Sequence, residues 1–336
     1  MATALPDQAR GFFLCDVLDA IPKGDMATME HPVFSLSTRP DLRILRYDRG
    51  GTQVTVTPSV RGLATIHDKD ILIYCVSQLM AAINAGRSVS RRLHLRAADL
   101  LAATGRENSG DGYRRLCQAF ERLAGTRITT NIATGAGEDA VETTTGFGLI
   151  EGWEIVRKTR GGRMVSVAVT LSEWLFRAVC AKSVLTLSRD YFGLRKPLER
   201  RVYELARKHC GRQPAWRIGI ATLHEKSGSA SPRRVFRKMI RDMATADALP
   251  DYHLEMEEGD VLRVRPRDAL LGEVPQPAPR PSEAALGEAR VLMPRHDVHA
   301  LAAEWQGVWA ATGRRRLRSP DGAFLGWVRK RAARDA

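Results

Sequence analysis

The sequence contains no apolar run that approaches 18 residues, so we expect no membrane span and no membrane partner. Residues 1–22 hold acidic residues and two prolines and lack the long apolar stretch of a secretory signal. No CxxC pair occurs, and the five cysteines are predicted to be buried thiols of a reducing compartment: Cys15, Cys75, Cys117, Cys180 and Cys210. Together these absences predict a cytoplasmic protein.

The motifs of several catalytic classes are also absent. There is no GxxxxGK[ST] of a nucleotide-hydrolysing motor, no HEXXH or paired Cys/His spacing, and no GxSxG nucleophile turn. No His-x-His pair of a nicking relaxase is present, and the acids do not cluster as a two-metal nuclease requires. His296 and His299 stand three residues apart, but two histidines alone do not predict a metal site. We therefore predict no catalytic residue, no metal and no cofactor.

What the sequence does contain is positive charge. Lys and Arg number 52 against 38 Asp and Glu, which gives a net charge of +14 over 336 residues. Such an excess favours a polyanionic partner. Of the two such partners, nucleic acid and an anionic membrane surface, we predict nucleic acid. The length and an apolar content of 44% are sufficient for two or more domains with separate cores.

Apolar periodicity and turn residues predict one order of elements twice, namely helix, short strand, helix, helix and hairpin. In the first half the predicted elements are helix 68–85, strand 93–95, helices 97–104 and 112–125, and strands 127–132, 146–159 and 163–171, the last two joined by a turn at 160–162. In the second half they are helix 194–210, strand 216–220, helices 221–228 and 231–247, and strands 252–257 and 261–266. A further hairpin of strands 43–47 and 52–57 is predicted near the N-terminus.

The two halves align without a gap at an offset of 123 residues. Position after position keeps its apolar, glycine or basic character, as in the pairs Leu95 and Ile218, Gly105 and Gly228, Tyr113 and Phe236, and Arg114 and Arg237. This indicates an internal repeat of whole domains. The alternative is a chance match between two amphipathic helices.

We therefore predict an α+β fold of tandem winged-helix domains with a short helical C-terminal tail. The predicted boundaries are an N-terminal arm with a β-hairpin at 1–62, a first winged-helix domain for dimerisation or backbone contacts at 63–182, a second for sequence recognition at 183–271, a Pro-rich linker at 272–283 and a basic helical tail at 284–336. Within the tail we expect helices at 298–312 and 322–333 around a basic cluster at 314–318.

The segment SPRRVFRKMIRDM, residues 231–243, is predicted to be an amphipathic helix with Ser231 as N-cap and Pro232 at the first helical position. One arc of about 140° is apolar and contains Val235, Phe236, Met239, Ile240 and Met243. The opposite arc is basic and contains Arg233, Arg234, Arg237, Lys238 and Arg241. Because like charges at i,i+4 repel, this face costs helix stability unless a polyanion neutralises it. A solvated charged face is the alternative.

Two further sets of basic residues are candidates for DNA contacts. Arg263, Arg265 and Arg267 recur at period two and therefore share one face of the last strand. A plain solvated edge strand is the alternative for them. In the first half the corresponding helix carries Arg114 and Arg115, with Arg122 offset by Glu121. Arginine and lysine can bind guanine in the major groove, and other basic residues hold phosphates.

Several long stretches closely resemble the plasmid replication initiator protein A family of alphaproteobacteria. They are DMATMEHPVFSLSTRPDLRILRY (25–47), GLATIHDKDILIYCVSQLMAA (62–82), SGDGYRRL (109–116), TGFGLIEGWEIVRKTRGGRMVSV (145–167), VTLSEWLF (169–176) and LSRDYFGLRKPLERRVYELARKHCG (187–211). Such initiators are similar in plan to iteron-binding Rep proteins with two winged-helix domains. The resemblance implies binding of double-stranded DNA at origin repeats, duplex opening, recruitment of the host replicative helicase or its loader, plasmid copy number control, repression of the protein's own promoter by a homodimer, and a plasmid- or nucleoid-associated location.

Two other functions stay open at this point. A winged-helix transcriptional regulator without initiator activity needs the same groove-contacting helix, and direct repeats of about 20 bp beside the gene distinguish the initiator from it. A DNA-nicking enzyme is the third hypothesis, with Tyr113 or Tyr191 as the nucleophile.

Overall fold

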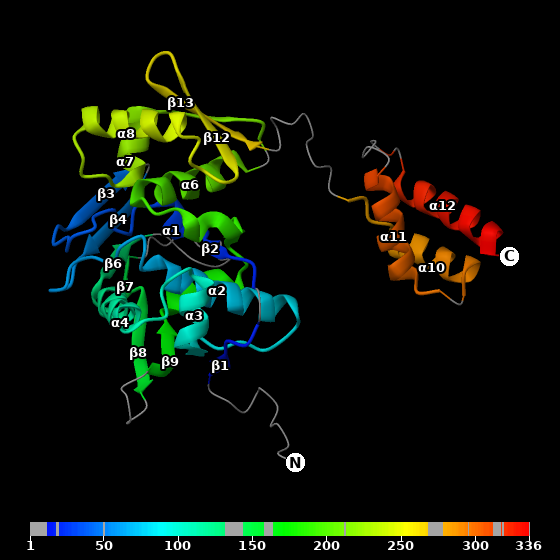
Figure 1. The fold of residues 1–336 in the computed structure, drawn as a ribbon, viewed down its shortest axis with the longest axis horizontal. Helices are drawn as coiled ribbons and strands as arrows, with labels where there is room; N and C mark the ends of the chain where they lie inside the picture. Colours follow the sequence, from blue (N-terminus) through cyan, green and yellow to red (C-terminus); the bar gives the residue numbers. More distant parts are fainter. Residues whose placement is uncertain are drawn as a thin grey trace. The chain divides into compact units, whose positions relative to one another are not determined.

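The structure, a computed structural model, describes residues 12–17, 20–49, 51–131, 144–157, 164–211, 213–267, 278–294, 296–311, 317 and 319–335. The chain divides into two units, Met1–Pro266 and Arg267–Ala336, each with buried apolar residues of its own (Figure 1). The domain boundaries expected after residues 62 and 182 fall inside the first unit and stay predictions.

The first half of this unit is built around α2 (Lys69–Asn84). The helix is apolar around most of its circumference and is therefore buried on most sides, with Ile71, Cys75 and Leu79 fully excluded from solvent. Next come β5 (Arg92–Arg96), α3 (Ala97–Ala103) and α4 (Gly110–Gly125). The predicted order of helix, strand, helix and helix is confirmed here.

Two four-stranded sheets complete the first half. The N-terminal hairpin of β3 (Leu45–Arg49) and β4 (Thr52–Thr57) continues through β6 (Arg127–Thr130) to β7 (Thr145–Gly148). It packs Leu45, Val54 and Val56 into the core of this half. The hairpin, which was assigned to an N-terminal arm, therefore shares a core with the first half. The second sheet has the order β1-β5-β9-β8 and adds β1 (Phe13–Leu14), β8 (Ile150–Arg157) and β9 (Met164–Leu171).

The single strand predicted at 146–159 is wrong, because the structure breaks it at Leu149 into β7 and β8. β7 pairs with β6, whereas β8 pairs with β9, so the break carries the chain from one sheet to the other. Leu149 is buried at the crossing, and a side chain on Gly148 would lie 2.9 Å from the carbonyl oxygen of Ile150. A bulky residue therefore has no room at the corner. The turn predicted at 160–162 lies outside the described residues.

The segments between the halves bind the N-terminus to the middle of the chain. β2 (Lys23–Asp25) pairs with β10 (Val184–Thr186), and α1 (Met26–Glu30) packs against α6 (Pro197–Cys210). α5 (Glu173–Cys180) and the 3-10 helix η2 (Arg189–Gly193) complete the connection. The first unit is therefore one folded body with two adjoining cores.

The second half repeats the plan with fewer strands. After α6 come β11 (Trp216–Gly219), α7 (Ile220–Ser227), α8 (Arg233–Thr245) and the hairpin β12 (Tyr252–Glu257) and β13 (Val261–Pro266). The hairpin boundaries agree with those predicted. In both halves the short first strand pairs antiparallel with the last strand of the hairpin, β5 with β9 and β11 with β13.

The repeat is real in element order, but its register shifts by one residue at the third helix. Gly105 and Gly228 both have positive φ, at 63° and 71°, at the turn after the second helix, as the offset of 123 requires. Along the third helix, burial instead matches at an offset of 124. Gly112, Leu116 and Ala119 of α4 are buried like Phe236, Ile240 and Met243 of α8. The gapless alignment is therefore wrong there.

Gly112 explains part of this shift. A Cβ atom at this position would overlap the carbonyl oxygen of Glu107, in the turn that precedes α4. The α3–α4 turn thus lies directly against its helix and leaves no space for a side chain. The second half places the ring of Phe236 at the corresponding buried position.

A buried ionic network joins α2 to α6. Lys69 Nζ lies 2.8 Å from Glu204 Oε1, and Arg200 Nη1 donates to Asp70 Oδ1 at 2.5 Å, with all four side chains under 5% exposed. Arg106 extends it with a contact of 3.4 Å to Asp70. The network holds the two halves in one arrangement, because an unpaired charge at this depth carries a large desolvation penalty.

Burial also acts on two histidines of the first unit. It lowers the pKa of His67 to about 4, with a further contribution from Arg200 and Arg106. Burial likewise lowers the pKa of His31 to about 4. Both rings are therefore neutral in the folded protein near pH 7, which makes its stability depend on pH.

The second unit contains α10 (Glu283–Leu292), α11 (Val298–Ala311) and α12 (Pro320–Asp335). Trp305 and Phe324 meet edge to face in its core, at 5.5 Å between ring centroids. The Ser282 hydroxyl donates to Asp321 at 2.7 Å and ties the start of α10 to the start of α12. The helices predicted at 298–312 and 322–333 are present. The basic cluster predicted at 314–318 lies outside the described residues except for Leu317.

The structure also bears on the predicted cysteine burial and on the expected lack of a membrane span. Cys15, Cys75 and Cys210 are buried as predicted, but Cys117 is half-buried and Cys180 is exposed, so the prediction is wrong for Cys180. In the part of the chain that the structure describes, no helix combines the length and apolar character needed to cross a bilayer.

Candidate nucleic-acid interface

The start of α8 differs by one residue from the prediction. Pro232, with φ −52° and ψ 143°, is the N-cap residue, and α8 begins at Arg233. Ser231 was expected at the cap, yet its carbonyl lies 2.7 Å from His224 Nε2 of α7 instead. Pro232 has no side chain that can accept a hydrogen bond, so no capping side chain accepts from the first backbone N–H groups of α8. The contact from His224 fixes the turn between α7 and α8.

The apolar face of α8 is narrower than predicted. Phe236, Ile240 and Met243 are buried and pack into the core of the second half. Val235 and Met239, which were assigned to the same apolar arc, are 46% and 38% exposed. Both residues lie on the predicted apolar arc, but the core meets α8 along a stripe that is narrower than this arc.

Most of the basic face of α8 is open to solvent. Four of its cations are exposed, and no carboxylate of the described residues lies within ion-pair distance of any of them: Arg233, Arg234, Lys238 and Arg241. Figure 1 shows α8 beside β12 and β13 at one end of the first unit. A row of unneutralised cations on one helix is a surface suited to a polyanion.

Arg237 differs from the other cations of the helix. Its Nε lies 2.7 and 2.9 Å from the two carboxylate oxygens of Asp260, in the turn of the β12–β13 hairpin. Asp260 has a φ of 63°, and its carbonyl accepts from the backbone N–H of Ile220 at 2.9 Å. The guanidinium of Arg237, with Arg241 and Arg233 nearby, lowers the pKa of this aspartate. Arg237 thus fastens the hairpin turn to α8.

The arginines of the last strand face glutamates across the sheet. Arg263 Nη1 lies 3.9 Å from Glu255 and 3.6 Å from Glu257, and Arg265 Nη2 lies 3.4 Å from Glu255. Arg267 follows the strand as the first residue of the second unit. DNA contacts by these three residues stay predictions. A phosphate that binds Arg263 or Arg265 has to compete with the neighbouring glutamates.

The helix of the first half presents a different surface. Arg114 and Arg115 are exposed, but both form ion pairs with Asp111 one turn earlier on α4. Arg122 points inward, where its Nε and Nη2 donate to Asp68 at 2.7 and 2.8 Å. The predicted role of Arg114 and Arg115 in DNA contacts stays untested, and Arg122 serves the packing of α4 on α2.

A cleft of about 840 Å³ lies along α4, and the sequence interpretation missed it. Both arginines and acidic residues line it, and Arg106 and Arg115 pair there with Asp70 and Asp111. Loop residues contribute the exposed Arg39 and Arg195 to its wall, beside Arg106 and Arg115. Arg39 lies in a segment where no helix was predicted. Arg195 was assigned to the predicted helix 194–210, whereas α6 begins only at Pro197. Tallying charge helix by helix cannot find such residues, because the tertiary fold alone brings them together.

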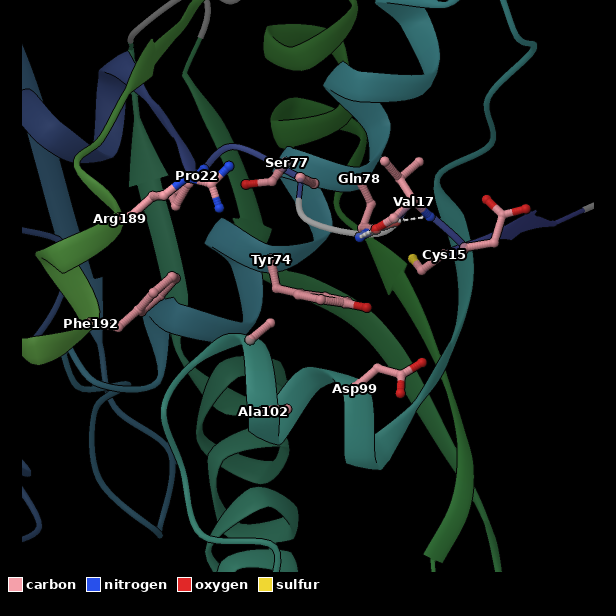
Figure 2. Close-up of a pocket in the computed structure, with 13 residues that line it drawn as sticks. Cys15, Val17, Pro22, Tyr74, Ser77, Gln78, Asp99, Ala102, Arg189 and Phe192 are labelled. Atoms are coloured by element: carbon pink, nitrogen blue, oxygen red, sulfur yellow. Dashed lines mark hydrogen bonds between the residues drawn. The ribbon is translucent and has the colours of Figure 1, made fainter.

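A smaller pocket of about 400 Å³ lies where the N-terminal segment crosses α2 (Figure 2). Tyr74, Ser77 and Gln78 of α2 form one wall. The Gln78 amide donates to the carbonyl of Val17 at 2.9 Å and accepts from its N–H at 3.0 Å, so this side chain holds the segment in place. The pocket is thus part of the attachment of the N-terminus.

The two tyrosines considered as nicking nucleophiles differ in their surroundings. Tyr191 is fully buried, and its hydroxyl donates to Glu204 Oε1 at 2.8 Å inside the ionic network. Burial raises its pKa well above the usual value. The Tyr113 hydroxyl donates to Asn108 at 2.6 Å. Tyr191 cannot reach a DNA phosphate in this fold.

These observations define the class of the protein as a mixed α+β protein with a duplicated helical plan and an exposed cationic helix. The chain belongs to the Replication initiator protein A family (RPA), whose sequence profile matches residues 23–254. The resemblance inferred from the motifs is thereby confirmed, and with it a role in replication initiation.

A relative named "Putative replication protein", from Wigglesworthia glossinidia brevipalpis, is 37% identical over 246 residues, which cover 72% of this chain and 88% of the relative. Among solved structures, domains 2 and 3 of RctB are similar in fold with a TM-score of 0.51 at 14% identity, over 70% of this chain and 94% of that one. The likeness supports the mixed α+β fold.

Proposed function

We propose that this replication initiator binds double-stranded DNA at origin repeats through α8. The observation that carries the proposal is the row of exposed cations on this helix, Arg233, Arg234, Lys238 and Arg241, which have no carboxylate partner among the described residues. Such a row is unfavourable in isolation, because like charges at i,i+4 repel. Phosphates remove that penalty and release counterions.

We propose further that both halves are winged-helix domains. In each half a helix-turn-helix pair is followed by a hairpin whose last strand pairs with the short strand before the pair. In this type of unit the last helix lies in the major groove, and its N-terminal residues contact the bases. In the second half the hairpin is the wing, held against α8 by Arg237 and Asp260.

The two halves have unequal roles in this proposal. The arginines of α4 are paired with Asp111 on the same helix, whereas most cations of α8 are open. The second half therefore recognises sequence, and the first half contributes backbone contacts or the interface of a homodimer. The cleft along α4 supplies the exposed Arg39 and Arg195 for such contacts.

The remaining steps follow from the family and are proposed with it. Binding at repeated origin sites helps to open the duplex and recruits the host replicative helicase or its loader. A homodimer represses the protein's own promoter and so contributes to plasmid copy number control. The alternative, a regulator without initiator activity, has less support because the chain is a member of an initiator family.

Footprinting on the DNA upstream and downstream of the gene tests the proposal. The variant Arg234→Ala/Lys238→Ala is compared with Arg92→Ala/Arg177→Ala, which removes two arginines that are exposed but ion-paired on other elements. We expect the first variant to lose the specific footprint and the second to keep it. Retention in the first variant removes α8 from base recognition, and the absence of any wild-type footprint removes origin binding.

A further inference from the structure

The exposed apolar residues of α8 form a small patch with no structural role. Val235 is 46% and Met239 38% exposed, although Phe236, Ile240 and Met243 on the same helix are almost fully buried. At about 100° per residue, Val235 and Met239 are four positions and about 40° apart. They therefore lie side by side on the solvent face.

The surroundings of this patch identify what can cover it. Lys238 lies three positions after Val235 and therefore adjoins it on the helix surface, with Arg234 one turn before Lys238, whereas Met239 adjoins Asp242. A second protein surface that covered Val235 and Met239 would have to bury these cations as well, at a large desolvation penalty. A DNA groove offers phosphates to the cations and apolar groups to the patch at the same time.

The position along the helix agrees with this partner. α8 begins at Arg233, so Val235 and Met239 lie in its first two turns. In helix-turn-helix units these turns point at the base edges of the major groove. The only apolar group that a base presents there is the 5-methyl of thymine.

The other half of the repeat provides a comparison. In the burial register of 124 residues, Asp111 and Arg115 of α4 occupy the positions of Val235 and Met239. These two residues form an ion pair at 2.6 Å. The apolar patch is therefore peculiar to the half with open cations, and the shared fold does not require it.

We propose that Val235 and Met239 contact thymine methyl groups in the major groove, which makes the chain specific for sites with thymine at one or two fixed positions. This inference rests on the proposed binding of DNA by α8 and adds the base that the helix selects. Arg234 and Lys238 provide affinity through phosphates, and the two apolar residues provide discrimination.

Replacement of thymine by deoxyuridine tests the inference, because it removes only the 5-methyl group. The probe is the footprinted duplex, synthesised with single thymines replaced in turn. Burial of one methyl group is equivalent to about a 4-fold change in Kd. We expect the wild type to lose about that factor at one or two thymines in each site and to be unaffected elsewhere.

The variant Val235→Ala/Met239→Ala should bind the thymine and deoxyuridine duplexes with equal Kd. Val156→Ala, which truncates a valine that is 50% exposed on β8, is the matched control and should keep the wild-type ratio. Thermal unfolding should be unchanged in all variants, because the altered side chains lie on the surface.

Three results would overturn the inference. One is a wild-type Kd that is indifferent to every replacement, and another is a double variant that keeps the thymine preference. The third is a double variant that changes only the sedimentation coefficient, which would assign the patch to a protein contact. In each case the proposed function would still stand if the wild type gives a specific footprint and the variant Arg234→Ala/Lys238→Ala loses it.

Discussion

The salt dependence of DNA binding should change when exposed, unpaired cations of α8 are removed, and should not change when Arg237 is removed together with its partner Asp260. Each phosphate neutralised on B-DNA contributes about −0.9 to the slope of log K against log salt. Removing Arg234 and Lys238 should therefore make the slope shallower by about 1.8. Between 50 and 200 mM salt, the wild type should lose about 10-fold more affinity than the variant.

The matched control removes a charge pair from the same surface. In Arg237→Gln/Asp260→Asn the net charge is unchanged, since the arginine is neutralised by the aspartate of the hairpin turn. We expect its slope to equal that of the wild type, with a lower melting temperature because the turn is no longer fastened to α8.

Fluorescence anisotropy with a labelled duplex across a salt series measures both slopes. The reasoning fails if Arg234→Ala/Lys238→Ala leaves the slope unchanged, because the open cations would then not contact phosphates. It also fails if the control makes the slope shallower by the same amount. Arg237 would then contact a phosphate in spite of its ion pair with Asp260.

Three predictions concern stability and can be checked by urea denaturation. Because His31 and His67 have folded-state pKa values of about 4, the unfolded chain alone takes up protons as pH falls from about 6.5, so stability should fall by about 1–3 kcal/mol per histidine between pH 6.5 and 4. His67→Gln should flatten this dependence, and an unchanged slope would contradict the assignment. Gly112→Ala should destabilise by about 1–3 kcal/mol through overlap with the preceding turn, whereas Gly110→Ala, in open space on the same helix, should be neutral or slightly stabilising. Glu204→Gln should cost about 3–5 kcal/mol because it leaves a buried lysine charge without its partner; a loss below 1 kcal/mol would show that the network is not needed.

Element order was predictable because it depends on local periodicity. The strands 252–257 and 261–266 and the helix 97–104 could be placed from alternation and turn residues alone. The corner at Leu149 could not, because nothing local distinguishes a strand that changes sheets from one that continues. The one-residue shift between α4 and α8 was hidden for the same reason, since both alignments preserve amphipathic character.

The candidate site was predictable as a helix but not as a surface. The basic content of α8 is evident in the sequence, yet the partner of Arg237 is 23 residues away in the hairpin turn. Arg122 resembled its exposed neighbours and instead pairs with Asp68, which is 54 residues distant. The structure alone shows which cations are open.

By itself, the sequence determined the α+β content, the duplicated order of elements, the cationic character of α8 and membership of the initiator family. These properties follow from composition, from periods of two and 3.6 residues, and from motifs along the chain. The tertiary structure decided which side chains of α8 pack, which pair and which remain exposed. That decision depends on what faces each side chain across the fold, so Val235 and Met239 became visible as a surface only there.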